Sequence, residues 1–576
     1  MNFKHLRNIF IGVGAVMLST LIYAQFPGGG FGGGFPGGGF MGFDRFGNPG
    51  NSVEPGGFGG FGGSGGFGGF GGGMMGGMMG GMMGGNVQYD PSQGRKVEFT
   101  SSNLPIVIIE TGGKAINSES KLTATMKIID NGSGRRNKVT DKPNGYDGKI
   151  GIKLRGNSSL YFEQKRFTIE TRDNDGKALN AELLGMPADN DWVLLAPYND
   201  ISMMRDPFAF DLWNEMGHWA PRNRYCEVVI DGNYVGVYIL CEKIKRGENR
   251  LDIAKLKPTD NSGIDLTGGY IVRIDPVEGN EPYFTSDVPG ITSMGGGGFG
   301  GGFPGGMGGF GGGFGGGFNT VTWTYYYPKS DKITEEQQKY ISDYIKTVEK
   351  VIQSDNFADP DEGYAKYISV QSFVDYFIHT ELSLNADGLK RSAYFYKKKQ
   401  NPDGTGGKLH AGTVWDYNLA YGNCNFCNAN KIDAWVYEGG ETNPTPAMWK
   451  RLTEDPAFMD KVKARWKELR KGVLSIENIN RYIDSHASQL AEAQERQYSK
   501  YSDLLVPKSQ GAQGNRGGFG GGGFGGFGGF RAGGLGGGAD TIGMFAAYRV
   551  STYQEEIATL KKWFADRIAF LDSNWK

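Results

Sequence analysis

Two hydrophobic periods divide the chain into a front part and a back part. In the front part, short apolar or alternating runs are bounded by Gly, Asn and Asp, which is typical of β-strands and turns. Asp231-Gly232-Asn233 separates two such runs and predicts a hairpin. One helical pattern lies among the strands, at about residues 202–216. The predicted strands cover residues 104–110, 122–129, 149–155, 166–171, 226–230, 234–240 and 270–274.

The back part follows the helical period of about 3.6 residues. Its last segment carries a single apolar stripe, which we assign to core packing. Strands followed by helices predict an α+β domain, or a two-lobed one with a cleft between a β-rich N-terminal part and a helical C-terminal part. The predicted helices cover residues 334–354, 370–385, 446–472, 476–505 and 546–573.

Three tracts rich in Gly, Phe and Met interrupt this pattern, and they hold much of the unusual glycine content, 98 of 576 residues. Such sequence loses much backbone entropy on ordering and buries little apolar surface, so we expect all three to be flexible. The first forms a linker at residues 25–90, and the others are surface inserts in a domain at residues 95–576; their Phe and Met side chains could support self-association. The tracts cover about residues 26–86, 292–318 and 514–538.

The first 24 residues have the features of a secretory signal peptide. Lys4 and Arg7 precede an apolar stretch at residues 9–22, and Ala24 offers a cleavage site. An uncleaved anchor is the alternative, but the stretch is shorter than the roughly 20 residues that span a bilayer. We therefore expect an exported protein, either periplasmic, held at the cell surface or secreted, with no integral membrane segment after cleavage.

Charge and cysteine content narrow the function classes. The 61 basic and 62 acidic side chains give a net charge of −1, which argues against a nucleic-acid partner. Cys226 and Cys241 flank the predicted hairpin, and Cys424 and Cys427 form a C-x-x-C pair. Export permits disulfides. Because none of the five histidines stands at ligand spacing, we expect disulfides or thiols rather than a zinc site.

Two acidic residues of the back part stand where a phosphate-transfer site would need them. Asp387 follows an apolar helical segment, and Asp416 lies in residues 413–418, after a strand-like stretch at residues 392–397. In kinase-type sites, an acid in a loop orients or deprotonates the attacking hydroxyl, and an acid at a strand end holds Mg²⁺ on the nucleotide phosphates. The spacing alone is also common in α+β proteins that lack such a site.

Three features of the front part suit phosphate binding. The polar loop at residues 155–159 could present backbone N–H groups to phosphate, and Lys165 could reach the α- or β-phosphate. Glu242, at the end of the hairpin, could hold Lys165 by an ion pair. The plain alternatives are an ordinary turn and a solvated lysine at a strand edge.

Together these segments resemble the CotH family of atypical, kinase-like proteins, named after spore coat protein H. The resemblance covers about residue 100 to the C-terminus, apart from the glycine-rich inserts, with five motifs in the family's order. They are Arg155-Gly156-Asn157-Ser158-Ser159 with Lys165-Arg166-Phe167-Thr168-Ile169, then Met204-Arg205-Asp206, the G-x-Y-x-G-x-Y-x-L-x-E run at 232–242, Asn385-Ala386-Asp387, and Trp415-Asp416-Tyr417-Asn418.

This resemblance implies a two-lobed, atypical protein-kinase-like fold that transfers phosphate from ATP to protein hydroxyls with Mg²⁺ or Mn²⁺. By motif, Asp387 would be the catalytic acid and Asp416 a metal ligand. Lys165, Glu242 and Arg155 would bind the nucleotide.

Two positions depart from the family pattern. Ser392 stands where kinase loops place an asparagine that binds the second metal, and Asn418 replaces the second acid of the family's W-D-x-D motif. Both would complete the metal site as weaker ligands. The chain is thus either an exported kinase of unknown protein substrate or a catalytically weak or inactive structural or assembly module. A carbohydrate-associated envelope enzyme is the third alternative.

Overall fold

The computed structural model describes residues 87–277, 279–291, 319–425, 427–439, 444–501, 505 and 550–576. The proposed signal peptide at residues 1–24 and the three glycine-rich tracts lie outside the described residues, so what we expect of them stays a prediction. All contacts discussed below fall within one compact unit, Gly69–Lys576.

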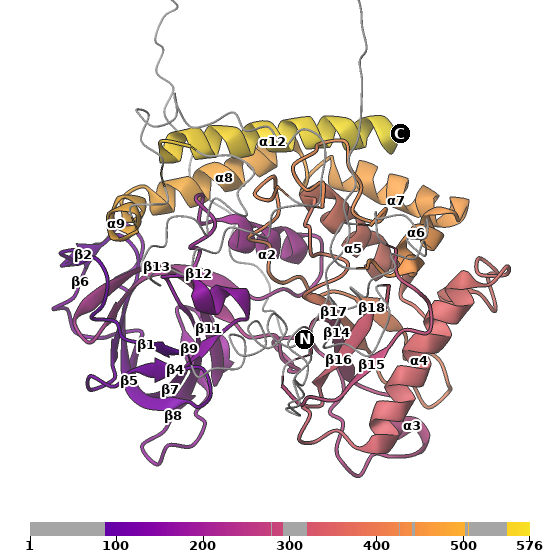
Figure 1. The fold of residues 1–576 in the computed structure, drawn as a ribbon, viewed down its shortest axis with the longest axis horizontal. Helices are drawn as coiled ribbons and strands as arrows, with labels where there is room; N and C mark the ends of the chain where they lie inside the picture. The colour runs from indigo at the N-terminus through magenta and orange to yellow at the C-terminus, as the bar shows by residue number, and fades with distance from the viewer. Residues whose placement is uncertain are drawn as a thin grey trace, which may run out of the picture. The chain divides into compact units, whose positions relative to one another are not determined.

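Seven strands of the front part close into a barrel (Figure 1). They are β3 (Ile106–Glu110), β5 (Leu122–Ile129), β7 (Tyr146–Arg155), β8 (Arg166–Arg172), β11 (Asp191–Leu195), β12 (Asn223–Ile230) and β13 (Asn233–Glu242). Their order around the barrel is β11-β13-β12-β3-β5-β7-β8. Neighbours are antiparallel except β12 and β3, which run parallel. Closure satisfies the edges that an open sheet would expose.

Alternate side chains of these strands fill the barrel, as the two-residue period requires. Phe167, Ile169 and Trp192 belong to this interior core and are fully buried. The opposite faces of β11 and β13 are also covered, because Val193 and Ile239 belong to the larger core that contains the helices. Burial on both faces explains why the sequence of β13 is almost continuously apolar.

A second sheet links the two parts of the chain. It contains β15 (Tyr283–Thr285), β16 (Thr322–Tyr327), β14 (Tyr270–Ile274), β17 (Ala393–Lys397) and β18 (Leu409–Ala411), antiparallel and in that spatial order. The three two-stranded pairs of the described residues are β1 (Gln88–Tyr89) with β4 (Ile116–Asn117), β2 (Ser101–Ser102) with β6 (Asn137–Lys138), and β9 (Ala181–Leu183) with β10 (Met186–Asp189).

The back part is helical, but two predicted helices are divided. Residues 446–472 form two helices because the Asp455 side chain accepts the Ala457 N–H and Pro456 takes the first helical position, which together start a new helix. The segment at 476–505 is divided as well. The helical elements are α2 (Arg205–Glu215), α3 (Gly263–Leu266), α4 (Glu335–Gln353), α5 (Val370–Ser383), α6 (Ala447–Thr453), α7 (Pro456–Leu469), α8 (Ile476–Leu490), α9 (Ala493–Lys500), α12 (Tyr553–Asn574), and the short 3₁₀ turns η1 (Ser158–Tyr161) and η2 (Tyr364–Lys366).

Helices α2 and α5 are buried over most of their surface. Phe208 of α2 packs against Tyr421 and against Phe564 of α12, while α12 runs along α8 (Figure 1). The fold is thus mixed α and β, β-rich toward the N-terminus and helical toward the C-terminus, as predicted. The closed barrel is a feature that the sequence pattern does not predict. Among the described residues, no helix is both long and apolar enough to cross a membrane.

The structure contains all four cysteines as thiols. Cys226 belongs to the core inside the barrel, whereas Cys241 belongs to the core outside it. The two side chains therefore lie on opposite faces of the barrel wall, and a disulfide between them would require the strands to rearrange. Cys424 and Cys427 pack together with Ala386, next to Asp387.

Candidate functional site

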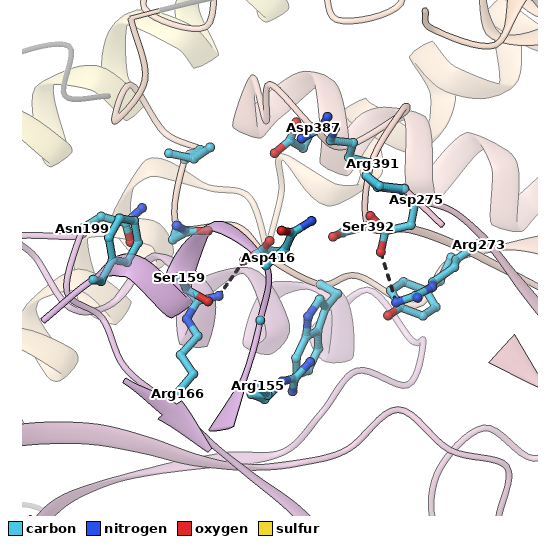
Figure 2. A pocket seen from close by; sticks show the side chains of 18 residues that line it. Arg155, Ser159, Arg166, Asn199, Arg273, Asp275, Asp387, Arg391, Ser392 and Asp416 are labelled. Atoms are coloured by element: carbon cyan, nitrogen blue, oxygen red, sulfur yellow. Dashed lines mark hydrogen bonds and ion pairs between the residues drawn. The ribbon is translucent and has the colours of Figure 1, made fainter. Parts of the chain in front are cut away.

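A pocket of about 1010 Å³, counting its part open to solvent, gathers charged side chains from distant parts of the chain (Figure 2). One wall comes from the barrel, where β7 turns into β8, and the others come from β14 and from the loops after α5 and β18. The charged and polar side chains that line it include Arg155, Ser159, Arg166, Asn199, Arg273, Asp275, Asp387, Arg391, Ser392, Asp416 and Asn418.

The barrel wall of the pocket is a tight polar turn. Gly156 has a φ of +107°, and a Cβ there would overlap the Ser159 hydroxyl, so this position requires glycine. The turn connects Arg155, the last residue of β7, to its strand partner Arg166, the first residue of β8. Arg155 lies over the Trp415 ring, 5.0 Å from its centroid. Two arginines thus enter the pocket from the barrel.

Asp416 faces Arg166 across the pocket. Its Oδ1 lies 3.1 Å from Nη1 of Arg166, whose side chain is 9% exposed (Figure 2). Asp416 has a φ of +64°, an unfavourable region for a residue with a side chain. The next peptide is held by Asp206 of α2, which accepts the Tyr417 N–H at 2.5 Å. We expected Asp416 to lie at the end of a strand, but residues 413–418 form a loop beyond β18. The contacts with Arg166 and with the Asp206 side chain therefore hold this part of the chain, rather than sheet hydrogen bonds.

Asp387 lies in the loop that follows α5. The helix ends at Ser383, and the next residue, Leu384, is left-handed with a φ of 44° and turns the chain toward the pocket. Burial raises the pKa of Asp387; the positive charges of Arg391 and Lys390 oppose this, and the nearby Asp416 adds to it. A raised pKa suits a carboxylate that must accept a proton near neutral pH.

Ser392 and Asn418 also line the pocket, so four predicted oxygen-bearing residues meet there with Arg155. Among the described residues, no cluster of three or more His, Cys, Asp or Glu side chains could hold a metal. Mg²⁺ commonly binds through one or two carboxylates, waters and substrate phosphates rather than an all-protein cage. Asp387 and Asp416, with the neutral oxygens of Ser392 and Asn418, fit that mode of binding.

Lys165 and Glu242 lie outside this pocket, and the ion pair that we expected between them does not form. The Lys165 ammonium donates to the carbonyls of Leu160, at 2.7 Å, and of Phe162. The Glu242 carboxylate is fully buried and binds Arg222 at 2.8 Å. Lys165 precedes β8 by one residue, and successive side chains point to opposite sides. The cation that this segment directs to the pocket is therefore its neighbour Arg166.

Sequence reasoning missed five charged or amide side chains that line the pocket, those of Arg166, Asn199, Arg273, Asp275 and Arg391. For Arg166, the signal was present, since it follows Lys165 in the same motif and precedes an apolar run. Arg273 stood out weakly, as the charge within the predicted strand at residues 270–274; it pairs with Asp275 at 3.1 Å (Figure 2). Asn199 and Arg391 carried no signal, because loop residues acquire their surroundings only in the folded chain.

Comparison with known protein families identifies a match for most of the sequence. The family model described as "CotH kinase protein" matches residues 152–571, most of the chain. The matched range includes both barrel arginines, Asp387 and Asp416. No curated protein matches the sequence.

Proposed function

This chain belongs to the CotH kinase protein family, and on that premise we propose that it is a protein kinase that transfers phosphate from ATP to a Ser, Thr or Tyr hydroxyl with Mg²⁺ or Mn²⁺. The observation that carries the proposal is the meeting of Asp387 and Asp416 in one pocket, opposite Arg155 and Arg166. Phosphoryl transfer uses acidic side chains together with positive charges that stabilise the phosphates. The two carboxylates and the two guanidinium groups of this pocket offer both. The proposed signal peptide makes it an exported kinase.

In this proposal Asp387 is the catalytic residue. It accepts the proton of the attacking hydroxyl, and its raised pKa suits that task. Asp416 holds the divalent cation together with Ser392 and Asn418. When bound, the cation neutralises charge on the nucleotide phosphates.

Arginines take the role that we first assigned to Lys165. Arg155 and Arg166 line the pocket and can donate to phosphate oxygens in pairs, which suits a planar guanidinium. Arg166 is bound to Asp416 in this structure, and its remaining N–H groups would be available to phosphate oxygens in the pocket. Lys165 instead supports the turn between β7 and β8 through its bonds to carbonyls.

The test is transfer from γ-labelled ATP by the purified protein, with Mg²⁺ or Mn²⁺, to itself and to a mixture of candidate proteins. Asp387→Asn should lower transfer by about 10²–10⁴-fold, the usual contribution of a general base. Asp403→Asn, which changes an exposed aspartate of another loop, is the matched control and should transfer as the wild type does. Equal transfer by the wild type and Asp387→Asn would refute the assignment.

A second candidate function is a structural or assembly module with the same fold. It is favoured by the Arg166–Asp416 ion pair, which occupies the acid that a metal needs, and by the weaker ligands Ser392 and Asn418. No transfer by the wild type, with no rise in melting temperature on adding ATP and Mg²⁺ or Mn²⁺, would make this candidate the leading one.

A further inference from the structure

The C-x-x-C pair takes no part in the proposed reaction. Its two thiols differ in access, because Cys424 is fully buried whereas Cys427 is half-buried. They pack in one small cluster with Ala386, the residue before Asp387. A reagent in solution therefore reaches Cys427 first, and Cys424 is a neighbouring thiol that is shielded from the solvent.

A buried ammonium contacts the more accessible of the two thiols. Lys390 is 5% exposed, and its Nζ donates to Sγ of Cys427 at 3.2 Å. It interacts electrostatically with Asp387, but it forms no ion pair with a carboxylate in the described part of the chain. Burying an ammonium is costly unless a negative charge or several acceptors compensate it. A negative charge on the Cys427 sulfur would do so, since an ammonium beside a sulfur stabilises the thiolate, which is the nucleophilic form.

The ammonium and the thiol border a cavity that is separate from the candidate functional site. The cavity measures about 240 Å³, counting its part open to solvent, and none of its lining residues lines the larger pocket. Lys390 supplies the charge in this lining, whose other described members include the apolar Leu384, Trp435 and Val436. The Cys427 side chain thus borders open space as well as packed atoms.

We propose that Cys427 is a thiol modification site that exchanges with small disulfides. Lys390 activates its sulfur, and Cys424 converts the resulting mixed disulfide into a Cys424–Cys427 bond. The inference goes beyond the proposed function, because no step uses ATP, a metal ion or Asp387.

The exchange has two balanced steps. First, the Cys427 thiol gives up its proton and its sulfur attacks one sulfur of the small disulfide. The new S–S bond forms as the old one breaks, and a small thiolate leaves and takes up a proton. Second, the deprotonated Cys424 sulfur attacks the Cys427 sulfur, and a second small thiol leaves. The cysteine pair is oxidised by two electrons, and the small disulfide is reduced to two thiols. Because Cys424 reacts only with a neighbouring sulfur, its burial does not prevent the second step.

Oxidised glutathione, added to the whole reduced protein without denaturant, ATP or metal, tests the site by mass analysis of the peptides. The wild type should form a Cys424–Cys427 disulfide, which lacks the two thiol hydrogens. Cys424→Ser should instead accumulate glutathione on Cys427. An adduct that accumulates on Cys427 of the wild type would refute resolution by Cys424, and an unmodified Cys427 in both proteins would refute the site.

The role of Lys390 is tested by the rate of adduct formation in the Cys424→Ser background. Lys390→Met should slow the reaction about tenfold, because the positive charge beside the sulfur is lost, and Lys390→Arg should keep most of the rate. Lys431→Met, which changes an exposed lysine four residues after Cys427, is the matched control and should have no effect.

An unchanged or higher rate in Lys390→Met would overturn the activation, and so would equal slowing by Lys390→Arg, since the charge would then not be what matters. If Lys390→Met does not fold, Lys390→Gln gives the same test, because it keeps a donor for the sulfur without the charge. These outcomes are independent of phosphate transfer, so a protein that exchanges its thiols but transfers no phosphate would uphold this inference and refute the kinase.

Discussion

The ion pairs between the barrel and α9 allow us to predict how much single substitutions lower the free energy of unfolding. Arg496 donates from Nε and Nη2 to the two oxygens of Glu227, at 2.7 and 2.6 Å. Glu227, on β12, is fully buried, and Tyr234 donates to it as well. Arg136 joins the same network through Glu492, but its side chain is 47% exposed. We predict that Arg496→Met destabilises the fold far more than Arg136→Met.

The magnitudes follow from burial. Breaking a buried ion pair by removing one partner costs about 3–5 kcal/mol, because the remaining charge is left in a low dielectric. Breaking an exposed pair costs about 0–1 kcal/mol. The two variants should therefore differ by at least about 2 kcal/mol in the free energy of unfolding, although both remove one arginine from the same network.

Urea denaturation at neutral pH, followed by tryptophan fluorescence, measures this difference. A third variant, Glu227→Gln with Arg496→Met, removes the buried charge and should recover part of the stability lost in Arg496→Met alone. Equal destabilisation by the two arginine variants, or a double variant no more stable than Arg496→Met, would show that burial of Glu227 does not set the energy of this contact.

Two further predictions concern titration and thiol reactivity. Arg136, and with it Arg496, holds the pKa of Glu492 at about 2 against an ordinary 4.5. The resulting stabilisation is therefore present above pH 4.5 and lost as the pH falls toward 2. The Glu492 side chain is 35% exposed, so Glu492→Gln should lower the free energy of unfolding by only about 1 kcal/mol at pH 6, and by less at pH 3. Urea titrations at the two pH values measure this difference, and an equal loss of stability at both would contradict the prediction. Maleimide should modify Cys427 first, because this cysteine is half-buried and the other three are buried. Burial also raises the pKa of the Cys226 thiol and so lowers its thiolate fraction. Mass analysis of the native protein after brief labelling checks the order, and earlier labelling of Cys226 would contradict it.

Local periodicity predicted the elements of this fold better than their assembly. The alternating run at residues 122–129 is strand β5 with the same bounds, since one face of it is buried and the other is not. The closure of the barrel depends on the parallel pairing of β12 with β3, whose residues are about 120 positions apart. No pattern within either strand encodes that partner. The short apolar strand β11 was missed for a different reason, because a run of five residues is too short to be distinguished from a loop by its pattern.

In the candidate site, too, the sequence predicted some residues correctly and missed how others are placed by the fold. Motif order placed Asp387 and Asp416 in one pocket, although neither acid has a local feature that requires it. The prediction of Lys165 was one residue out of phase, since Arg166 is the side chain that reaches the pocket. Alternation along a strand fixes which neighbours share a face, but which face meets the pocket depends on packing outside the strand.

Helix α2 connects the site to the stability of the whole fold. Arg166 and Asp416 are 250 residues apart in sequence, and the loop of Asp416 is fastened to α2 through Asp206. One residue earlier, the buried Arg205 pairs with Glu556 of α12 at 2.8 Å. Any ligand that binds Asp416 therefore acts on a loop whose anchors also hold the C-terminal helix. If a ligand at Asp416 stabilises the packing of α2, then loosening that packing weakens binding of the ligand. The two effects are equal in free energy, because linkage is reciprocal.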